Sequence, residues 1–102
     1  MSHDLTEEQF EEKVIETSDT EKVVVDFWAP WCAPCQSLAP RLEKACEEQE
    51  LALYKVNVDD NPELASTYGV RGIPAVKIFH NGEIVDEFTG VQPPDKIRNF
   101  LQ

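Results

Sequence analysis

The stretch KVVVDFWAPWCAPCQ, residues 22–36, decides the fold. Residues 22–29 are apolar on both faces of the expected strand, which is typical of a strand buried between two layers. A tight connection follows, and the apolar residues after it recur with helical spacing, so we expect a helix over residues 34–49. A buried strand followed at once by a helix indicates an α/β protein, and it places Cys32 and Cys35 where the helix begins.

Capping signals define two helices outside this stretch. Thr6 and Gln9 have the spacing of a capping box that opens a helix over residues 5–16. Asn61 should cap a short helix that Gly69 ends. The sequence therefore predicts where each of these helices begins.

The C-terminal half contains the signal of a β-hairpin. Asn81-Gly82 separates two apolar segments, and this dipeptide is the strongest short-range signal for a hairpin turn. The further strands are expected at residues 51–58, 75–80 and 83–90, and a helix over residues 93–102 closes the chain. The order α-β-α-β-α-β-β-α predicts one domain over residues 1–102, with a central mixed sheet of four to five strands flanked by about four helices.

Composition excludes several classes of partner. The chain of 102 residues carries 20 acidic and 9 basic residues, a net charge of −11, which argues against binding to nucleic acid phosphates. No apolar run approaches the roughly 18 residues of a membrane span. The acidic N-terminus lacks the apolar segment of a secretory signal. We therefore expect a cytoplasmic monomer that binds neither nucleic acid nor membrane.

The cysteine count indicates one chemically special pair. A disulfide-stapled secreted domain would carry more cysteines, in an even number, whereas this chain has Cys32, Cys35 and a leftover Cys46. A structural zinc ion takes four ligands, and only Cys46, His3 and His80 remain to complete a site. Cys46 lies about three helical turns from Cys35, too far to share one ion. We therefore expect no metal.

The position of the pair favours thiol–disulfide exchange. Cys32 would lie at a helix N-terminus, where free N–H groups and the helix dipole favour a thiolate. Cys35 would lie one turn further, on the apolar face. We therefore expect an exposed attacking sulfur at Cys32 and a sheltered resolving sulfur at Cys35. Trp31 offers a flat apolar surface to a polypeptide, and Pro34 stiffens the turn.

Asp26 is unusual because it interrupts a strand that is apolar on both faces. Burial of an unpaired carboxylate is costly and should raise its pKa. Lys55 interrupts the next strand in the same way, and consecutive strands often pair, so we expect the two side chains to lie close together. Two interpretations remain open: Asp26 accepts the proton of Cys35, or the two residues form a structural ion pair.

Several segments together resemble the thioredoxin family over nearly the whole chain: VVVDFWAPWCAPC (23–35), NVDDNPELASTYGVRGIP (57–74), the Asn-Gly hairpin and FTGV (88–91). The resemblance implies the thioredoxin fold. It implies that Cys32 attacks and Cys35 resolves, and that Asp26 and Lys55 form a buried proton-transfer pair. Pro74 would be cis, face the disulfide and block metal capture. The residues expected to contact substrate are Trp31, Ala33, Pro34, Ile73, Gly90 and Val91.

The active-site segment departs from the family's commonest pattern, WCGPCK, at two positions. Ala33 stands in place of glycine and stiffens the turn. Gln36 stands in place of lysine, so a nearby positive charge is missing, and we expect a modestly higher pKa for the Cys32 thiol than in a lysine-bearing sequence. The family's helix kink would lie at Pro40, and its first strand would be short or absent here.

The sequence thus predicts a thiol–disulfide oxidoreductase of the protein disulfide reductase type, working through a mixed disulfide. It would act on client proteins with exposed disulfides and be recycled by a thioredoxin reductase-type enzyme. Because the electrons reside on the two sulfurs, no cofactor is expected. The alternatives are a thioredoxin-fold binding subunit with incidental redox activity, and a disulfide oxidase or isomerase.

Overall fold

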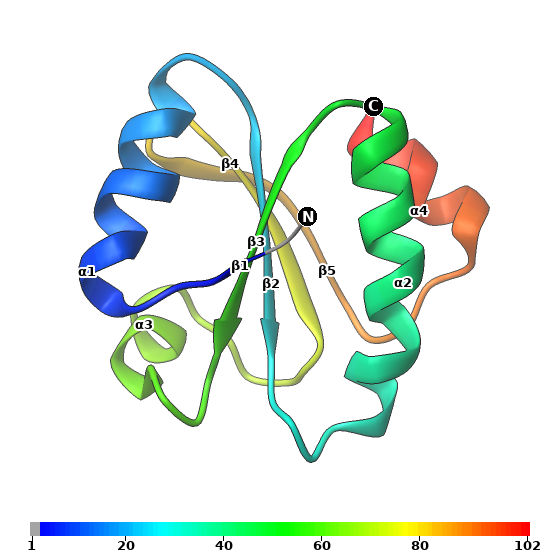
Figure 1. Ribbon diagram of the computed structural model, residues 1–102, viewed down its shortest axis with the longest axis horizontal. Helices are drawn as coiled ribbons and strands as arrows, with labels where there is room; N and C mark the ends of the chain where they lie inside the picture. Colours follow the sequence, from blue (N-terminus) through cyan, green and yellow to red (C-terminus); the bar gives the residue numbers. More distant parts are fainter. Residues whose placement is uncertain (1–2) are drawn as a thin grey trace.

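The computed structural model describes residues 3–102 and contains a five-stranded sheet in the order β1-β3-β2-β4-β5 (Figure 1). The strands are β1 (His3–Asp4), β2 (Val23–Trp28), β3 (Ala52–Asn57), β4 (Ala75–His80) and β5 (Glu83–Thr89). β3 pairs in parallel with β1 and β2, whereas β4 pairs antiparallel with β2 and β5. The predicted mixed sheet of four to five strands is confirmed, and the first strand, which was expected to be short or absent, consists of two residues.

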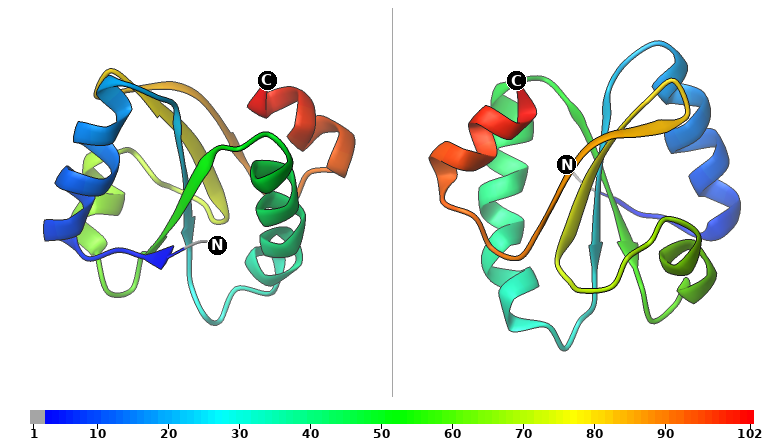
Figure 2. Two further views of the ribbon diagram at one scale, coloured as in Figure 1. Left: turned by 45° about the horizontal axis from the view of Figure 1, so that its top comes forward. Right: turned by 180° about the vertical axis from the view of Figure 1, so that it is seen from behind.

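Helices cover both faces of the sheet. They are α1 (Glu7–Phe10), α2 (Ala33–Glu48), α3 (Pro62–Thr67) and α4 (Pro94–Leu101). α1 and α3 lie on one face, and α2 and α4 lie on the other (Figures 1 and 2). α2 continues through Pro40 without interruption. Within residues 3–102, no helix combines the length and the apolar character that crossing a membrane requires.

The first helix begins as predicted but is not α-helical throughout. The Thr6 hydroxyl accepts from the Gln9 N–H at 3.3 Å, and Gln9 Oε1 accepts from the Thr6 N–H at 3.0 Å, so the capping box is confirmed. After α1 the chain continues as a π-helix over Glu11–Glu16 and a 3₁₀ turn over Thr17–Asp19. Apolar periodicity does not distinguish these forms, because all of them present one face to the core.

Asn61 corrects the second capping prediction. It occupies the position before α3, but its side chain makes no capping hydrogen bond. Instead, its Nδ2 donates to the backbone oxygens of Leu5 at 3.2 Å and Asn57 at 3.1 Å. These two bonds fix the orientation of the amide, and its oxygen accepts no hydrogen bond from the N–H groups at the start of α3. The prediction of a side-chain cap was therefore wrong.

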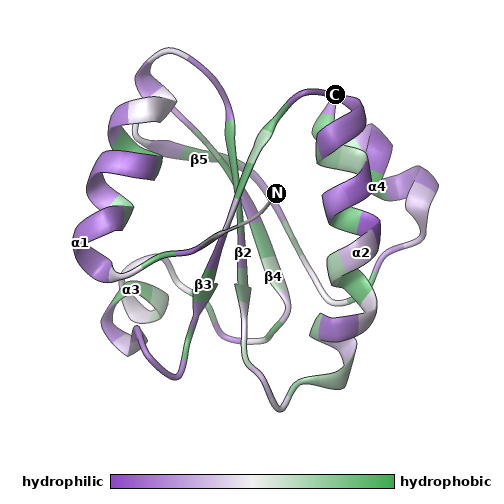
Figure 3. Cartoon of the chain, in the orientation of Figure 1, coloured by the Kyte–Doolittle hydropathy of each residue, from purple (hydrophilic) through white to green (hydrophobic). Residues whose placement is uncertain are grey.

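β2 is the centre of the core. Val24 packs toward α2 and α4, while Val23, Val25 and Phe27 pack toward α1 and α3, and all four are fully buried. Hydrophobic residues accordingly gather along the central strands, and hydrophilic residues cover much of the helix surfaces (Figure 3). Each fully buried valine or phenylalanine contributes roughly 1.5–3 kcal/mol of transfer free energy. This packing fixes the end of β2, from which the active-site segment emerges.

The hairpin between β4 and β5 forms at the predicted dipeptide. Asn81 has φ of 55° and Gly82 has φ of 76°, which are the positive values that a type I′ turn requires at both positions. An asparagine tolerates this conformation better than most residues, and a glycine adopts it without steric cost. The turn chemistry therefore decides where β4 ends and β5 begins.

Candidate active site

Cys32 and Cys35 form a disulfide at the start of α2, with their Cα atoms 5.3 Å apart. Cys32 is the capping residue of this 16-residue helix and has extended backbone angles. Its Sγ accepts from the Cys35 N–H at 3.2 Å. The same N–H and the helix dipole favour a negative charge on this sulfur when the pair is reduced, so the position suits an attacking thiolate.

The two sulfurs differ less in exposure than expected. Cys32 is 4% exposed and Cys35 is 2% exposed. Ala29 packs beside them, and Trp28, Val58 and Ile73 complete the apolar surroundings. The expectation of an exposed Cys32 is therefore wrong for the disulfide form, because these neighbours enclose both cysteines.

Asp26 is buried in the middle of β2 on the face that α2 covers. The residue is 1% exposed, and among the described residues its Oδ1 has no hydrogen-bond partner. Burial raises the pKa of this carboxyl to about 7, and the positive charge of Lys55 opposes the rise. Asp26 can therefore take up or release a proton near neutral pH.

Lys55 is the direct register partner of Asp26, as predicted for neighbouring strands. However, within the described part of the chain no ion pair joins their charged atoms. Lys55 Nζ lies instead over the ring of Trp28, 4.3 Å from its centroid. The interpretation of a structural ion pair is therefore wrong, because among the described residues Lys55 contacts the indole and forms no ion pair with Asp26.

The segment before β4 meets the active-site end of β2. β4 runs antiparallel to β2 with Ala75 opposite Phe27, so Pro74 reaches the end of the sheet where α2 begins. The Ile73–Pro74 peptide bond is cis, as the resemblance implied, and Ile73 packs against the cysteines. The Gly90 N–H donates to the Pro74 oxygen at 2.8 Å, which brings the end of β5 alongside.

A groove of about 590 Å³ runs beside this segment. It is lined by Trp31, Val58, Pro62, Ala65, Ser66, Val70, Arg71, Gly72 and Ile73. Trp31 is 70% exposed, and its Nε1 donates to Asp59 Oδ2 at 2.9 Å. Of the residues expected to contact substrate, the groove contains Trp31 and Ile73. The others that are exposed, Ala33, Pro34 and Val91, lie outside its lining, and Gly90 is half-buried.

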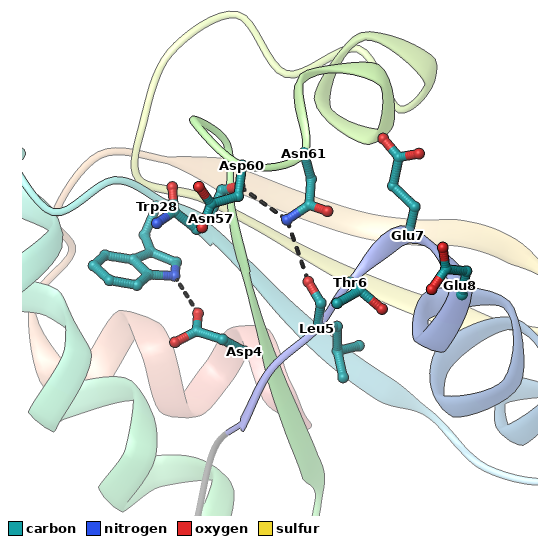
Figure 4. Close-up of a pocket in the computed structure, with 9 residues that line it drawn as sticks. All are labelled: Asp4, Leu5, Thr6, Glu7, Glu8, Trp28, Asn57, Asp60 and Asn61. Carbon is teal, nitrogen blue, oxygen red and sulfur yellow. Dashed lines mark hydrogen bonds between the residues drawn. The ribbon is translucent and has the colours of Figure 1, made fainter.

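Asp4 and Asp59 were not identified from the sequence. Asp4 Oδ1 accepts from the Trp28 Nε1–H at 2.7 Å (Figure 4). It lies in a strand of two residues, for which the sequence has no periodic signal. Asp59 lies in the family segment NVDDNP, but a turn residue of this kind gives no indication of its contact with Trp31. Gln36 was singled out for its missing charge, and its Nε2 donates to the Pro30 oxygen at 2.9 Å.

Cys46 is free and buried in α2, as expected for an inert thiol. Burial raises the pKa of Cys46 to about 12, and the charge of Asp26 adds to the rise. A thiol with such a pKa remains protonated at neutral pH, so it is a poor nucleophile.

The chain is similar to one family and to proteins of known name. The family model described as Thioredoxin matches residues 1–102. A thioredoxin of Rickettsia bellii is 41% identical over 103 residues, covering 99% of this chain and 96% of that protein. Thioredoxin 1 of Synechococcus elongatus is 40% identical over 99 residues, covering 95% and 91%. A thioredoxin of Griffithsia pacifica is 43% identical over 95 residues, covering 91% and 85%.

Proposed function

The chain belongs to the thioredoxin family, and from this premise we propose the roles of the residues around its disulfide. The protein is a thiol–disulfide oxidoreductase with disulfide reductase activity. Its redox centre is the Cys32–Cys35 pair, which accepts two electrons when it passes from disulfide to dithiol. The proposal concerns which sulfur attacks and where the protons go.

In the proposed reaction, the Cys32 thiolate attacks one sulfur of a client disulfide. The client S–S bond breaks, a mixed disulfide forms, and the first client thiolate leaves and takes a proton. Cys35 then gives its proton to Asp26, and its thiolate attacks the Cys32 sulfur. The mixed disulfide breaks, the second client thiolate leaves, and Cys32–Cys35 is oxidised. Two electrons have passed to the client. The first client thiolate takes a proton from water, which replaces the one that Cys32 released on ionising, and the second takes a proton from water as Asp26 releases the Cys35 proton.

The observation that carries the proposal is the state of Asp26. Its Oδ1 is buried without a hydrogen-bond partner among the described residues, and burial brings its pKa to about 7. A base is most effective when its pKa lies near the working pH, because it is then ionised and still able to hold a proton. Lys55, which lies beside it in the sheet, would stabilise the ionised form.

We propose that a client polypeptide lies between Trp31 and the segment at Pro74. The groove there is largely apolar, and exposed Trp31 offers a large amphipathic surface of the kind that binding sites favour. Pro74 has no N–H and its oxygen accepts from the Gly90 N–H, so it would contact the client through its ring beside the disulfide. Ala33, Pro34 and Val91 would contact the client at the margins.

Thioredoxin-family membership implies disulfide substrates and a reductase that recycles the oxidised pair. We propose that the clients are proteins with exposed disulfides, that a thioredoxin reductase-type enzyme recycles the protein, and that it works as a monomer in the cytoplasm. A free buried Cys46 beside one reactive pair is compatible with a reducing compartment. Sedimentation analysis and cell fractionation test the last two points.

Single-turnover reduction of a disulfide-bonded client protein tests the residue roles. We expect Cys32→Ser to abolish reduction, and Asp26→Asn to slow the release of the client from the mixed disulfide by about 10²-fold or more. Asp86→Asn on β5, an exposed site, provides the control. An unchanged release rate in Asp26→Asn would contradict the proton-acceptor role, and a strongly oxidising equilibrium potential against glutathione would favour an oxidase.

A further inference from the structure

Three charged residues lie in one row across the sheet. Asp4 on β1 is the register partner of Lys55 on β3, and Lys55 is the register partner of Asp26 on β2. Register partners in neighbouring strands project to the same face, so the side chain of Lys55 shares one face of the sheet with two acidic side chains. The row runs from the exposed edge of the sheet at Asp4 to the buried proton acceptor at Asp26.

Trp28 connects the exposed carboxylate with the ammonium group. Its Nε1–H donates to Asp4 Oδ1 at 2.7 Å, and Lys55 Nζ lies 4.3 Å from the centroid of its ring. A lysine over an indole gains a favourable cation–π interaction. Asp4 therefore holds the edge of the ring whose face carries Lys55, while the buried Asp26 Oδ1 has no hydrogen-bond partner among the residues described.

We propose that Asp4 is a positioning residue for disulfide reduction, which fixes the indole of Trp28 under Lys55 and competes with Asp26 for the charge of that lysine. The inference rests on the proposed role of Asp26 as proton acceptor and extends that role to the N-terminal strand. If Lys55 were fully available to Asp26, the carboxyl would ionise more readily and hold the Cys35 proton less well.

The surroundings of Asp26 support a specific contribution from Asp4. The groups whose charges act on Asp26 are Lys55 from β3, Glu43 from α2 and Asp4 from β1, and the Cys46 thiol also faces it from α2. On β4 the register partner is the apolar Val76. The charge of Asp4 raises the pKa of Asp26, in the direction that the proposal requires, although burial is the larger cause.

Asp4 is exposed to water, so its influence should be modest and sensitive to salt. It lines a cavity of about 530 Å³ together with Trp28, Glu7, Glu8 and Asp60 (Figure 4). Water in this cavity screens the charge. We therefore expect the charge of Asp4 to raise the pKa of Asp26 by about half a unit at low ionic strength and by less at high salt.

Asp4→Asn separates charge from hydrogen bonding. The amide oxygen can still accept from the Trp28 N–H, whereas the negative charge is lost. In the reduced protein, ¹³C NMR titration of the Asp26 carboxyl should show a pKa lower by about half a unit. Glu8→Gln is the matched control, because Glu8 lines the same cavity and, within residues 3–102, forms no hydrogen bond or ion pair with Trp28 or Lys55. This control should leave the pKa of Asp26 unchanged.

The titration of Asp26 and the pH profile of client release together decide the proposal. A lower pKa of Asp26 in Asp4→Asn, with an unchanged pKa in Glu8→Gln, supports the proposal. An equal shift in both variants, or no shift in Asp4→Asn, overturns it. The acid limb of the client-release rate should move to lower pH by the same amount. A shifted titration with an unshifted rate profile would support the effect of Asp4 and overturn the proton-acceptor role of Asp26, so the two proposals fail separately.

Discussion

Burial of Asp26 lowers the stability of the fold and at the same time gives this carboxyl a pKa suited to proton transfer. A carboxylate on a strand that is otherwise apolar opposes burial, and neither a hydrogen bond to Oδ1 nor an ion pair with Lys55 offsets this cost among the described residues. The result is a carboxyl whose pKa burial raises to about 7. Groups with such shifted values cluster at functional sites, where proton transfer near neutral pH requires them.

The pKa of Asp26 makes folding stability depend on pH in a defined direction. The folded value of about 7 lies above the ordinary value of 3.8, so between these values the folded state binds the proton and the unfolded state does not. Stability contributed by this residue is therefore lost as pH rises from about 4 to 7. In the oxidised protein, the free energy of unfolding of Asp26→Asn should therefore rise relative to that of wild type by about 4 kcal/mol between pH 4 and 7.

Urea unfolding at several pH values measures this difference. The disulfide form is chosen because Cys32 and Cys35 do not titrate in it. Asp86→Asn, at an exposed position, should follow wild type at every pH. A constant difference between Asp26→Asn and wild type from pH 4 to 8 would show that Asp26 is ionised in the folded state throughout.

Gln36 is the second residue whose chemistry is measurable. It is exposed at the first turn of α2 and holds the preceding loop through the Pro30 oxygen. Gln36→Lys would add a positive charge near Cys32, so we expect the pKa of the Cys32 thiol to fall by about half a unit or less. Thiolate absorbance in the reduced protein reports this value.

Gln102→Lys adds the same charge at the C-terminus, at the opposite end of α2 from the disulfide (Figure 1), and should leave Cys32 unaffected. An equal or higher Cys32 pKa in Gln36→Lys would contradict the expected effect of the missing lysine.

At the scale of elements, Asn61 joins two segments that lie far apart in the sequence. It is 6% exposed, and its side chain ties the segment before α1 to the turn between β3 and α3. Asp4, on the same N-terminal segment, reaches Trp28. The short strand β1 is therefore held in place by side-chain contacts as well as by its pairing with β3.

Asn61→Ala should lower the free energy of unfolding by about 2 kcal/mol. The variant leaves the Leu5 carbonyl without its side-chain donor, and an unsatisfied buried acceptor costs about this amount. Chemical unfolding with Asn99→Ala, an exposed position in α4, as control measures the effect. A loss below about 0.5 kcal/mol, the usual range for surface substitutions, would show that water replaces this donor.

At the scale of the whole molecule, the sequence predicted what local patterns and neighbouring strands determine. Three such predictions are confirmed: the buried strand that contains Asp26, the strand register that sets Asp26 opposite Lys55, and the Asn81-Gly82 turn. Each depends on a short segment or on consecutive strands. These features placed the disulfide at the start of α2 and the acid beneath that helix.

Features that depend on packing between distant segments were not predictable. The enclosure of Cys32 involves Ile73, which precedes β4 and lies far from Cys32 in the sequence. Asp4 meets Trp28 only because β1 lies next to β3 at the sheet edge. Whether Lys55 contacts a carboxylate or an indole depends on the relative positions of three strands, and no local sequence pattern indicates these positions.

We expect Cys32 to attack the client disulfide and Cys35 to resolve the mixed disulfide, and trapping of the mixed disulfide distinguishes these two roles. Each single variant, Cys35→Ser and Cys32→Ser, is reduced and mixed with a disulfide-bonded client peptide, and the adducts are identified by intact mass and peptide mapping. We predict a stable adduct on Cys32 in Cys35→Ser and little or none on Cys35 in Cys32→Ser over the same time. Equal trapping at both positions, or faster trapping at Cys35, would contradict it.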